Sequence, residues 1–302
     1  MKKKVISVLL ASAMVMSMFA GCGKKADDTA ADTAQEENTD GAAEDAADET
    51  ADTEGTDAGE AEKGTGKTFT VGFDAEYPPY GFMDESGEYT GFDLELAQAV
   101  CDLEGWELVK KPINWDSKDM ELNSGSIDCI WNGFTMNGRE DEYTFSVPYV
   151  DNSQVIVVAE DSGIEQLSDL AGKTVGVQAA SAALDLLQSE DEGGQKALAD
   201  TFGSLNEFAD YNTAFTELQA GALDALAIDV GVAKYQLNSR GEGFKILDET
   251  LNTEQYAIGF KKGNQELCDI VNKDLQELAN EGKVAELAEK YEIADMVTLK
   301  AE

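Results

Sequence analysis

The sequence predicts an α/β fold with two similar lobes, and three observations lead to this prediction. Segments typical of strands and of helices alternate from about residue 67 to the end of the chain. The segment ELNSGSID at 121–128 is echoed by ELQAGALD at 217–224, which indicates two units built alike. Two apolar, strand-like segments, at 154–159 and 255–260, bracket the second unit. We expect these two segments to cross between the lobes and to form a hinge.

The chain begins with the pattern of a secretory signal peptide. Lysines at 2–4 precede an apolar stretch at 5–20, which is too short for a comfortable membrane span. We therefore assign residues 1–21 to a signal peptide. The small residues before Cys22 resemble a bacterial lipobox, in which the cysteine is lipidated and becomes the first residue of the mature chain. The alternative is an ordinary signal peptide followed by a chance cysteine.

An acidic segment of low complexity follows, and we predict that residues 22–66 form a disordered tether. It consists mostly of Ala, Asp, Glu, Thr and Gly, so it cannot bury enough apolar surface to offset the entropy of ordering. The whole chain has a formal net charge of −39. This charge excludes nucleic acid as a partner and disfavours direct adsorption to an anionic bilayer. Membrane contact would therefore depend on the lipid at Cys22.

The residue inventory excludes several kinds of site. The chain has no histidine, which excludes Ser-His-Asp and Cys-His catalysis and any His-ligated metal. We expect neither a cofactor nor a metal ion. Three cysteines remain after Cys22 and are widely spaced; two of them, Cys101 and Cys129, lie in apolar segments and are expected to be small core residues. Cys268 is the third.

The first lobe is predicted from residues 67–153 and 255–302. Leu94, Ala97 and Val100 recur at helical spacing, and the Gly of each echoed segment is typical of a helix C-cap. The elements expected before the first crossing are strands at 69–73, 107–112 and 127–131 and helices at 92–103 and 119–123.

The second lobe is predicted from residues 154–254. Its alternation of strands and helices favours a mainly parallel sheet, as in the first lobe. The expected elements are strands at 173–177 and 225–228 and helices at 181–188, 211–220 and 230–237. After the second crossing, residues 265–291 are expected to be helical, with a break near Gly282.

The two echoed segments lead to charges of opposite sign. The first runs on to Arg139 and the second ends near Asp229. Ligands of open α/β sheets bind beyond the carboxyl ends of the strands, so the guanidinium of one lobe can oppose the carboxylate of the other. This arrangement fits a small zwitterion, that is, a free amino acid. The alternative is that each residue is a solvated surface group.

Several motifs together resemble the polar amino-acid solute-binding proteins of ABC importers (family 3). They are VGFDAEYPPY at 71–80, GFDLELA at 91–97, and WNGFT at 131–135 with Arg139. The resemblance covers about residues 67–292. It implies a two-lobed type II periplasmic-binding-protein fold with a hinge of two crossover strands. It also implies a monomeric, extracytoplasmic lipoprotein that binds a free amino acid and delivers it to an ABC permease, and that is not an enzyme.

The resemblance also implies a role for each of ten residues. The side chain of the ligand would lie near the acid of Asp74 and between the rings of Tyr77 and Trp115. Arg139 would hold the ligand carboxylate in a bidentate manner, and Asp229 would accept the α-ammonium. The remaining residues would donate hydrogen bonds to the ligand: Asn132, Gly133, Thr135, Ser181 and the amide of Ala182.

The sequence departs from the family pattern in two places. The spacing from Thr135 to Arg139 is shorter than usual, and QAASA at 178–182 replaces a Gly-Thr-rich loop. The identity of the amino acid is therefore not implied. Two other functions stay open: a ligand-sensing protein that works through a separate signalling partner, and a dehydratase of aromatic amino-acid biosynthesis built on the same fold.

Overall fold

The computed structural model describes residues 66–302. The predicted signal peptide, the lipidation site at Cys22 and almost all of the predicted tether lie outside these residues. In the described part of the chain, no helix combines the length and the apolar character that a membrane span requires.

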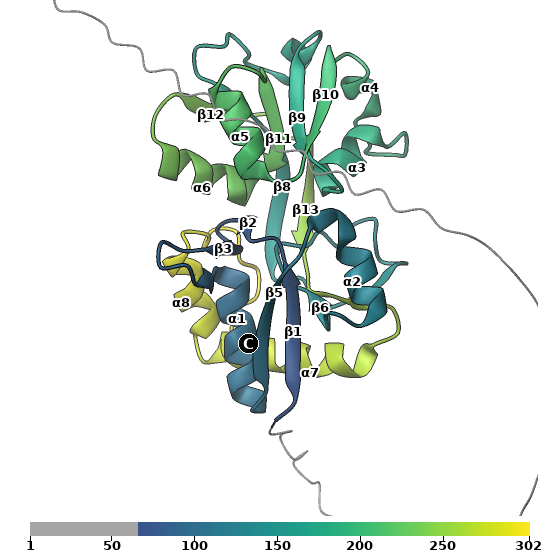
Figure 1. The fold of residues 1–302 in the computed structure, drawn as a ribbon, viewed down its shortest axis with the longest axis vertical. Coiled ribbons are helices and arrows are strands. Elements are labelled where there is room, and N and C mark those ends of the chain that lie inside the picture. Colours follow the sequence, from purple (N-terminus) through teal and green to yellow (C-terminus); the bar gives the residue numbers. More distant parts are fainter. Residues whose placement is uncertain (1–65) are drawn as a thin grey trace, which may run out of the picture. The chain divides into compact units, whose positions relative to one another are not determined.

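The first sheet defines lobe 1, in which Figure 1 labels β1, β5 and β6. It contains five strands in the order β5-β1-β6-β14-β7. Its longest pairing is the parallel pair of β1 and the edge strand β5, in register from Thr68–Glu107 to Phe73–Pro112. The strands of this sheet are β1 (Thr68–Phe73), β5 (Glu107–Pro112), β6 (Cys129–Ile130), β7 (Tyr143–Phe145) and β14 (Gly259–Lys261).

Four α-helices belong to lobe 1, and their apolar stripes explain their positions. α1 buries Leu94, Ala97 and Val100, as its spacing predicted, and α2 ends at Gly125 in the left-handed conformation. The bounds are α1 (Phe92–Glu104), α2 (Lys118–Ser124, after the 3-10 turn Trp115–Ser117), α7 (Gln265–Asn280) and α8 (Lys283–Lys290). A small sheet of β2 (Glu76–Tyr77), β3 (Gly81–Met83) and β4 (Tyr89–Thr90) also belongs to this lobe.

The second sheet defines lobe 2 and has the order β10-β9-β11-β8-β12. Its strands are β8 (Val150–Ala159), β9 (Thr174–Gln178), β10 (Ser204–Phe208), β11 (Ala225–Asp229) and β12 (Phe244–Ile246). Its helices are α3 (Ala182–Gln188), α4 (Lys196–Ala199), α5 (Tyr211–Gln219) and α6 (Val230–Arg240), with a 3-10 turn at Leu167–Leu170.

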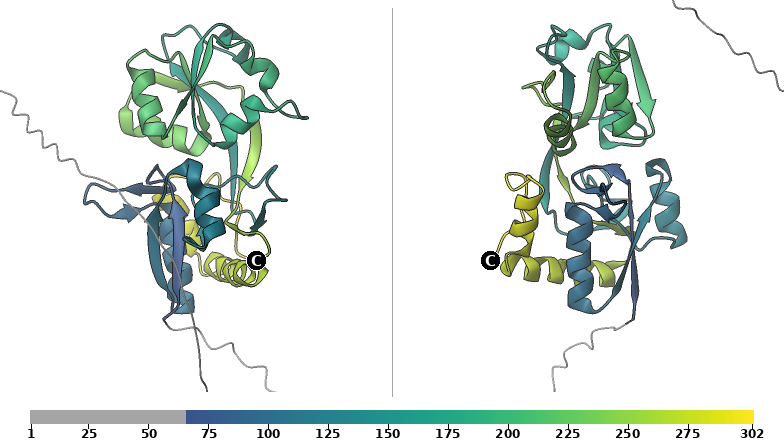
Figure 2. Two further views of the ribbon diagram at one scale, coloured as in Figure 1. Left: turned by 45° about the vertical axis from the view of Figure 1, so that its right-hand side comes forward. Right: turned by 60° about the vertical axis from the view of Figure 1, so that its left-hand side comes forward.

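Two adjacent strands connect the lobes. β8 leaves lobe 1 and runs into the second sheet, and β13 (Asn252–Tyr256) returns beside it (Figures 1 and 2). The two strands pair antiparallel, from Asn252–Gln154 to Tyr256–Val150. The first crossing contains the predicted segment 154–159, whereas the second begins earlier than predicted and shares only Gln255 and Tyr256 with the segment 255–260.

The sheets are mixed, because each contains one strand that runs against the others. This strand is β14 in the first sheet and β8 in the second, and it pairs antiparallel with its neighbours. The expectation of mainly parallel sheets did not include these reversed strands. β8 enters lobe 2 directly from the other lobe, without the helical crossover that parallel neighbours need, and it pairs antiparallel with β11. The predicted strand at 255–260 is divided between β13 and β14 for a related reason, because one part pairs with β8 and the other with β6.

The largest apolar cluster contains residues from both lobes. Tyr77 and Tyr80 of lobe 1 belong to it together with Tyr211 and Val232 of lobe 2. The rings of Tyr77 and Tyr211 are 6.0 Å apart. Cys101 and Cys129 are fully buried in this cluster, as predicted, and neither they nor the buried Cys268 forms a disulfide. Apolar packing thus continues from one lobe to the other beside the hinge.

Candidate functional site

A small cavity lies where the two lobes meet. Lobe 1 contributes β2, the start of the 3-10 turn before α2, and the loop after β6. Lobe 2 contributes the carboxyl ends of β9 and β11 and the start of α3. The lining residues are Tyr77, Trp115, Gly133, Thr135, Arg139, Gln178, Ser181, Ala182 and Asp229. The structure therefore brings together all of the predicted site residues except Asp74 and Asn132.

Asp74 and Asn132 lie directly behind this lining. The backbone amide of Asp74 donates to Asn132 Oδ1 at 2.9 Å. The Asp74 carboxylate accepts from Gln178 Nε2 at 2.6 Å and from the Glu76 amide at 2.8 Å. Burial raises the pKa of Asp74 to about 6. Since Gln178 belongs to lobe 2, the Asp74–Gln178 bond joins the two lobes at the edge of the cavity.

Arg139 forms a second polar contact between the lobes. Its Nη2 atom lies 2.6 Å from Asp185 Oδ2, on α3. Its Nη1 atom donates to the backbone oxygen of Thr135 at 3.4 Å, and the guanidinium lies 5.1 Å from the ring centroid of Phe134. The Arg139 side chain is only 12% exposed, whereas that of Asp185 is 61% exposed. The guanidinium is thus fixed at the cavity wall and bonded to a carboxylate that water can reach.

Asp229 ends β11 in lobe 2, is buried, and lines the same cavity. Its Oδ1 atom accepts three hydrogen bonds: from Asn152 Nδ2 at 2.9 Å, Gln154 Nε2 at 2.6 Å and Tyr256 Oη at 2.6 Å. The three donors come from the two hinge strands. Asp229 therefore connects the cavity to the hinge through side-chain hydrogen bonds.

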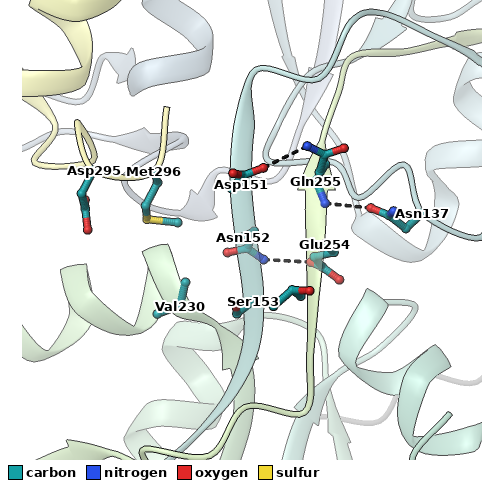
Figure 3. A pocket seen from close by; sticks show the side chains of 10 residues that line it. Asn137, Asp151, Asn152, Ser153, Val230, Glu254, Gln255, Asp295 and Met296 are labelled. Carbon is teal, nitrogen blue, oxygen red and sulfur yellow. Dashed lines mark hydrogen bonds between the residues drawn. The ribbon is translucent and has the colours of Figure 1, made fainter. Parts of the chain in front are cut away.

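Glu254, on β13, is a buried acid that the sequence analysis did not identify. Its Oε1 atom accepts from Thr135 Oγ1 at 2.9 Å and from Asn152 Nδ2 and Gln154 Nε2, both at 2.8 Å. Figure 3 shows Asn152 and Glu254 side by side on β8 and β13. Burial, and secondly the charge of Asp229, raise the pKa of Glu254. The signal that could have revealed it is an acid immediately before the segment 255–260, which was predicted to cross between the lobes.

Further hydrogen bonds tie the two hinge strands together and to lobe 1. Gln255 Nε2 donates to Asp151 Oδ1 at 2.9 Å, and the Gln255 amide donates to Asn137 Oδ1 at 2.7 Å (Figure 3). These residues line a separate open hollow beside the hinge. The hinge strands are therefore held by side chains as well as by their ladder.

Two aromatic residues form part of the cavity wall. Tyr77 Oη lies 3.3 Å from Tyr256 Oη. Trp115 packs edge-on against Phe134, with 5.8 Å between the ring centroids.

Lys118 forms a further contact between the lobes. Its Nζ atom lies 5.3 Å from the Trp115 centroid and donates to the backbone oxygen of Ala180 in lobe 2 at 3.3 Å. Burial lowers the pKa of Lys118, and the nearby charge of Arg139 lowers it further.

The expected donors differ in their availability. Ser181 Oγ accepts from the Leu184 amide at 3.1 Å and thereby caps α3, which starts at Ala182. The amide of Gly133 donates to Asp93 Oδ2 at 2.6 Å in this arrangement, and its role as a donor to a ligand stays a prediction. Asp93 is fully buried and also accepts from Tyr149 Oη at 2.8 Å. Burial raises the pKa of Asp93 to about 7.

Comparison with known proteins gives a context for this geometry. The family model described as "Bacterial extracellular solute-binding proteins, family 3" matches residues 69–294. The chain belongs to this family. Its fold is the two-lobed type II fold of periplasmic binding proteins, as its structural neighbours show.

Individual relatives are moderately similar. The chain is 29% identical to the "L-cystine-binding protein TcyJ" of Escherichia coli, over 76% of this chain and 84% of that protein. It is 32% identical to the "Arginine-binding extracellular protein ArtP" of Bacillus subtilis, over 74% of this chain and 86% of that protein. A substrate-binding protein of an ABC uptake transporter from Streptococcus pneumoniae, solved with histidine bound, superposes with a TM-score of 0.72 and 33% identity. That match covers 76% of this chain and 94% of the other.

Proposed function

We propose that this solute-binding protein closes its lobes on one free amino acid outside the cytoplasm and delivers it to the permease of an ABC importer. The observation that carries the proposal is the placement of Arg139 and Asp229. They are contributed by different lobes and line the same small cavity. A guanidinium and a carboxylate on opposing walls are complementary to the carboxylate and the ammonium of an amino acid.

The remaining residues supply shape and hydrogen bonds. Arg139 would bind the ligand carboxylate bidentately, with donors that its single bond to Asp185 leaves available. Tyr77 and Trp115 would contact the side chain of the ligand, and Asp74 would lie near its end. Additional hydrogen bonds would be donated by Asn132, Ser181 and the amide of Ala182, whereas Thr135, whose hydroxyl proton goes to Glu254, would act as an acceptor.

Closure would follow from differential affinity. We assign residues 67–153 and 255–302 to lobe 1 and residues 154–254 to lobe 2, with the hinge at β8 and β13. An amino acid that bonds to Arg139 and Asp229 together can do so only when the lobes are close. It therefore shifts the population toward the closed form.

The location and the anchor are part of the proposal. The N-terminal sequence supports export through the signal peptide at 1–21 and lipidation at Cys22, which would hold the protein at the outer face of the cell membrane. The acidic segment at 22–66 would then act as a tether between the lipid and the lobes.

Two rival functions make different predictions. A dehydratase would release product from prephenate or arogenate, and mass spectrometry after incubation would detect it; as a binding protein, this chain would leave both compounds unchanged. A sensing protein would co-purify with a signalling kinase, whereas a transport receptor would co-purify with a permease.

A thermal-shift screen tests the proposal directly. The twenty amino acids and L-cystine are each added to the purified protein. The names of the relatives make L-arginine, L-histidine and L-cystine the first candidates. A ligand at 100 times its Kd adds about 2.7 kcal/mol to the free energy of unfolding, enough for a shift of several degrees. Arg139→Ala serves as the matched control and should show a much smaller shift at the same ligand concentration. The proposal fails if none of these compounds stabilises the wild-type protein.

A further inference from the structure

The two buried carboxylates beside the cavity share their hydrogen-bond donors. Asn152 Nδ2 donates to Asp229 Oδ1 at 2.9 Å and to Glu254 Oε1 at 2.8 Å. Gln154 Nε2 donates to the same two oxygens at 2.6 and 2.8 Å. The two carboxylate oxygens are therefore bridged twice by amide nitrogens, and each is less than 5% exposed as a residue. Such an arrangement places two like charges close together away from water.

The surrounding charges do not balance this pair. Within residues 66–302, no lysine or arginine forms an ion pair with Asp229 or Glu254. Arg139 is the nearby cation of lobe 1, and its ion pair is with Asp185 of α3. The other titratable groups that face the pair are four tyrosines on the cavity side and two acids on the side of the hinge hollow: Tyr77, Tyr80, Tyr211, Tyr256, Asp151 and Asp295. Apart from Arg139, none of these groups can supply a positive charge.

Two carboxyl groups in one buried site resist ionising together, because the charge on one raises the free energy needed to ionise the other. A single proton, or a cation that takes its place, relieves this cost. Burial, and secondly the charge of Asp229, raise the pKa of Glu254, and we therefore assign the shared proton to Glu254. Its oxygen still accepts from Thr135 when the carboxyl group is neutral.

We infer that the Asp229–Glu254 pair holds one proton when the site is empty, and that the α-ammonium of the bound amino acid displaces it. Binding then converts the Glu254 carboxylic acid into a carboxylate and releases one proton to the solvent, while the ammonium supplies the charge that the proton supplied before. This inference rests on the proposed function. It makes Glu254 a positioning residue of the ammonium site and makes amino-acid affinity depend on pH.

The ligand-linked test uses calorimetry with L-arginine and L-glutamine, whose own charges stay constant between about pH 5 and pH 8. Titrations in two buffers of different ionisation enthalpy give the number of protons released. The wild-type protein should release up to about one proton, and its affinity should weaken by up to tenfold for each pH unit below the raised pKa. Glu254→Gln keeps the shape and the accepting oxygen, so it should bind with no proton release and a flat pH profile.

Asp185→Asn is the matched control for this titration. Asp185 is an exposed acid at the same cavity wall and contacts Arg139, but it shares no donor with Glu254. Its variant should release the same number of protons as the wild type. If the wild type binds either amino acid without releasing protons, the inference is wrong even though the proposed function stands.

A second readout needs no ligand. A carboxyl group with a raised pKa in the folded state binds a proton that the unfolded state has lost. Its favourable contribution to the free energy of unfolding is therefore complete below the pKa that the group has in the unfolded chain. This contribution is lost as the pH rises through the pKa that the group has in the folded protein. The melting temperature of Glu254→Gln minus that of the wild type should thus increase as the pH rises above about 4.5. If this difference is independent of pH, Glu254 holds no proton and the inference is overturned, whichever amino acid the protein binds.

Discussion

Gly231 offers a way to keep the lobes apart without touching the proposed ligand contacts. It lies in the first turn of α6 in lobe 2 and faces Tyr80 of lobe 1. A Cβ atom at this position would be 2.4 Å from Tyr80 Oη and 3.1 Å from Tyr80 Cζ. In Gly231→Ala these atoms can separate only if the ring moves or the lobes open. Overpacking of this kind typically costs about 1–3 kcal/mol, which here opposes closure and corresponds to about 5- to 160-fold weaker binding.

The assay combines calorimetry with small-angle scattering. We expect Gly231→Ala to keep its far-ultraviolet dichroism, to bind more weakly, and to show a larger radius of gyration than the wild type at the same saturating ligand. Tyr80→Phe removes the hydroxyl oxygen that lies 2.4 Å from the added Cβ atom of residue 231, and it leaves ring carbons 3.1 and 3.2 Å from that Cβ atom. The double variant should therefore recover most of the lost affinity. Tyr80 Oη is buried without a partner among the described residues, so Tyr80→Phe alone should be nearly neutral. Wild-type affinity and compaction in Gly231→Ala would refute the view that ligand binding needs this contact between the lobes.

Three other predictions address different parts of the chain. Cys22→Ser should move the protein from the membrane fraction to the soluble fraction; if the wild type is also soluble, Cys22 carries no lipid anchor. Trp115 should report closure, so a ligand should change the intrinsic fluorescence of the wild type and much less that of Trp115→Phe; equal changes in both would place Trp115 away from the ligand. Because burial raises the pKa of Asp93 to about 7 from 3.8, the wild type should lose stability relative to Asp93→Asn as the pH rises between these values, and a melting-temperature difference that stays constant over this range would contradict it.

The sequence was informative about local elements and about the two opposing charges. Periodic apolar residues predicted α1, and the glycine at the end of each echo placed the strand that follows it. The echo also led to Arg139 and Asp229, which the structure places around one cavity. These features depend on spacing along the chain, which a sequence displays directly.

What the sequence could not show depends on pairing between distant segments. The antiparallel additions to both sheets arise from β8 and β14, whose partners are far away in the chain. The short strands β7 and β12 carry too few residues for a periodic signal. In the site, Glu254 becomes significant only because β8 places Asn152 and Gln154 beside it.

Contacts around the cavity also depend on residues that are distant in the sequence. The amide of Gly133 looked available to a ligand, yet the fold places the Asp93 carboxylate 2.6 Å from it. Asp185 has no motif of its own, and its ion pair with Arg139 depends on the approach of the two lobes. Gln178 contacts Asp74 for the same reason. Contacts between the lobes are therefore the part of the site that residue spacing does not encode.

The central claim is that Arg139 and Asp229 bind the two charged ends of one amino acid, and one calorimetric experiment tests it most directly. The amino acid that gives the largest thermal shift is titrated into the wild type, Arg139→Ala and Asp229→Ala, beside its des-amino and its decarboxylated analogues. Removal of one partner of a buried charge pair typically costs about 2–5 kcal/mol, or roughly 30- to 4000-fold in Kd. We predict that Asp229→Ala impairs binding of the amino acid more than of the des-amino analogue, and that Arg139→Ala impairs it more than the decarboxylated one. If both variants fold and still bind the amino acid within about threefold of wild type, the carboxylate and ammonium sites lie elsewhere and the account is wrong.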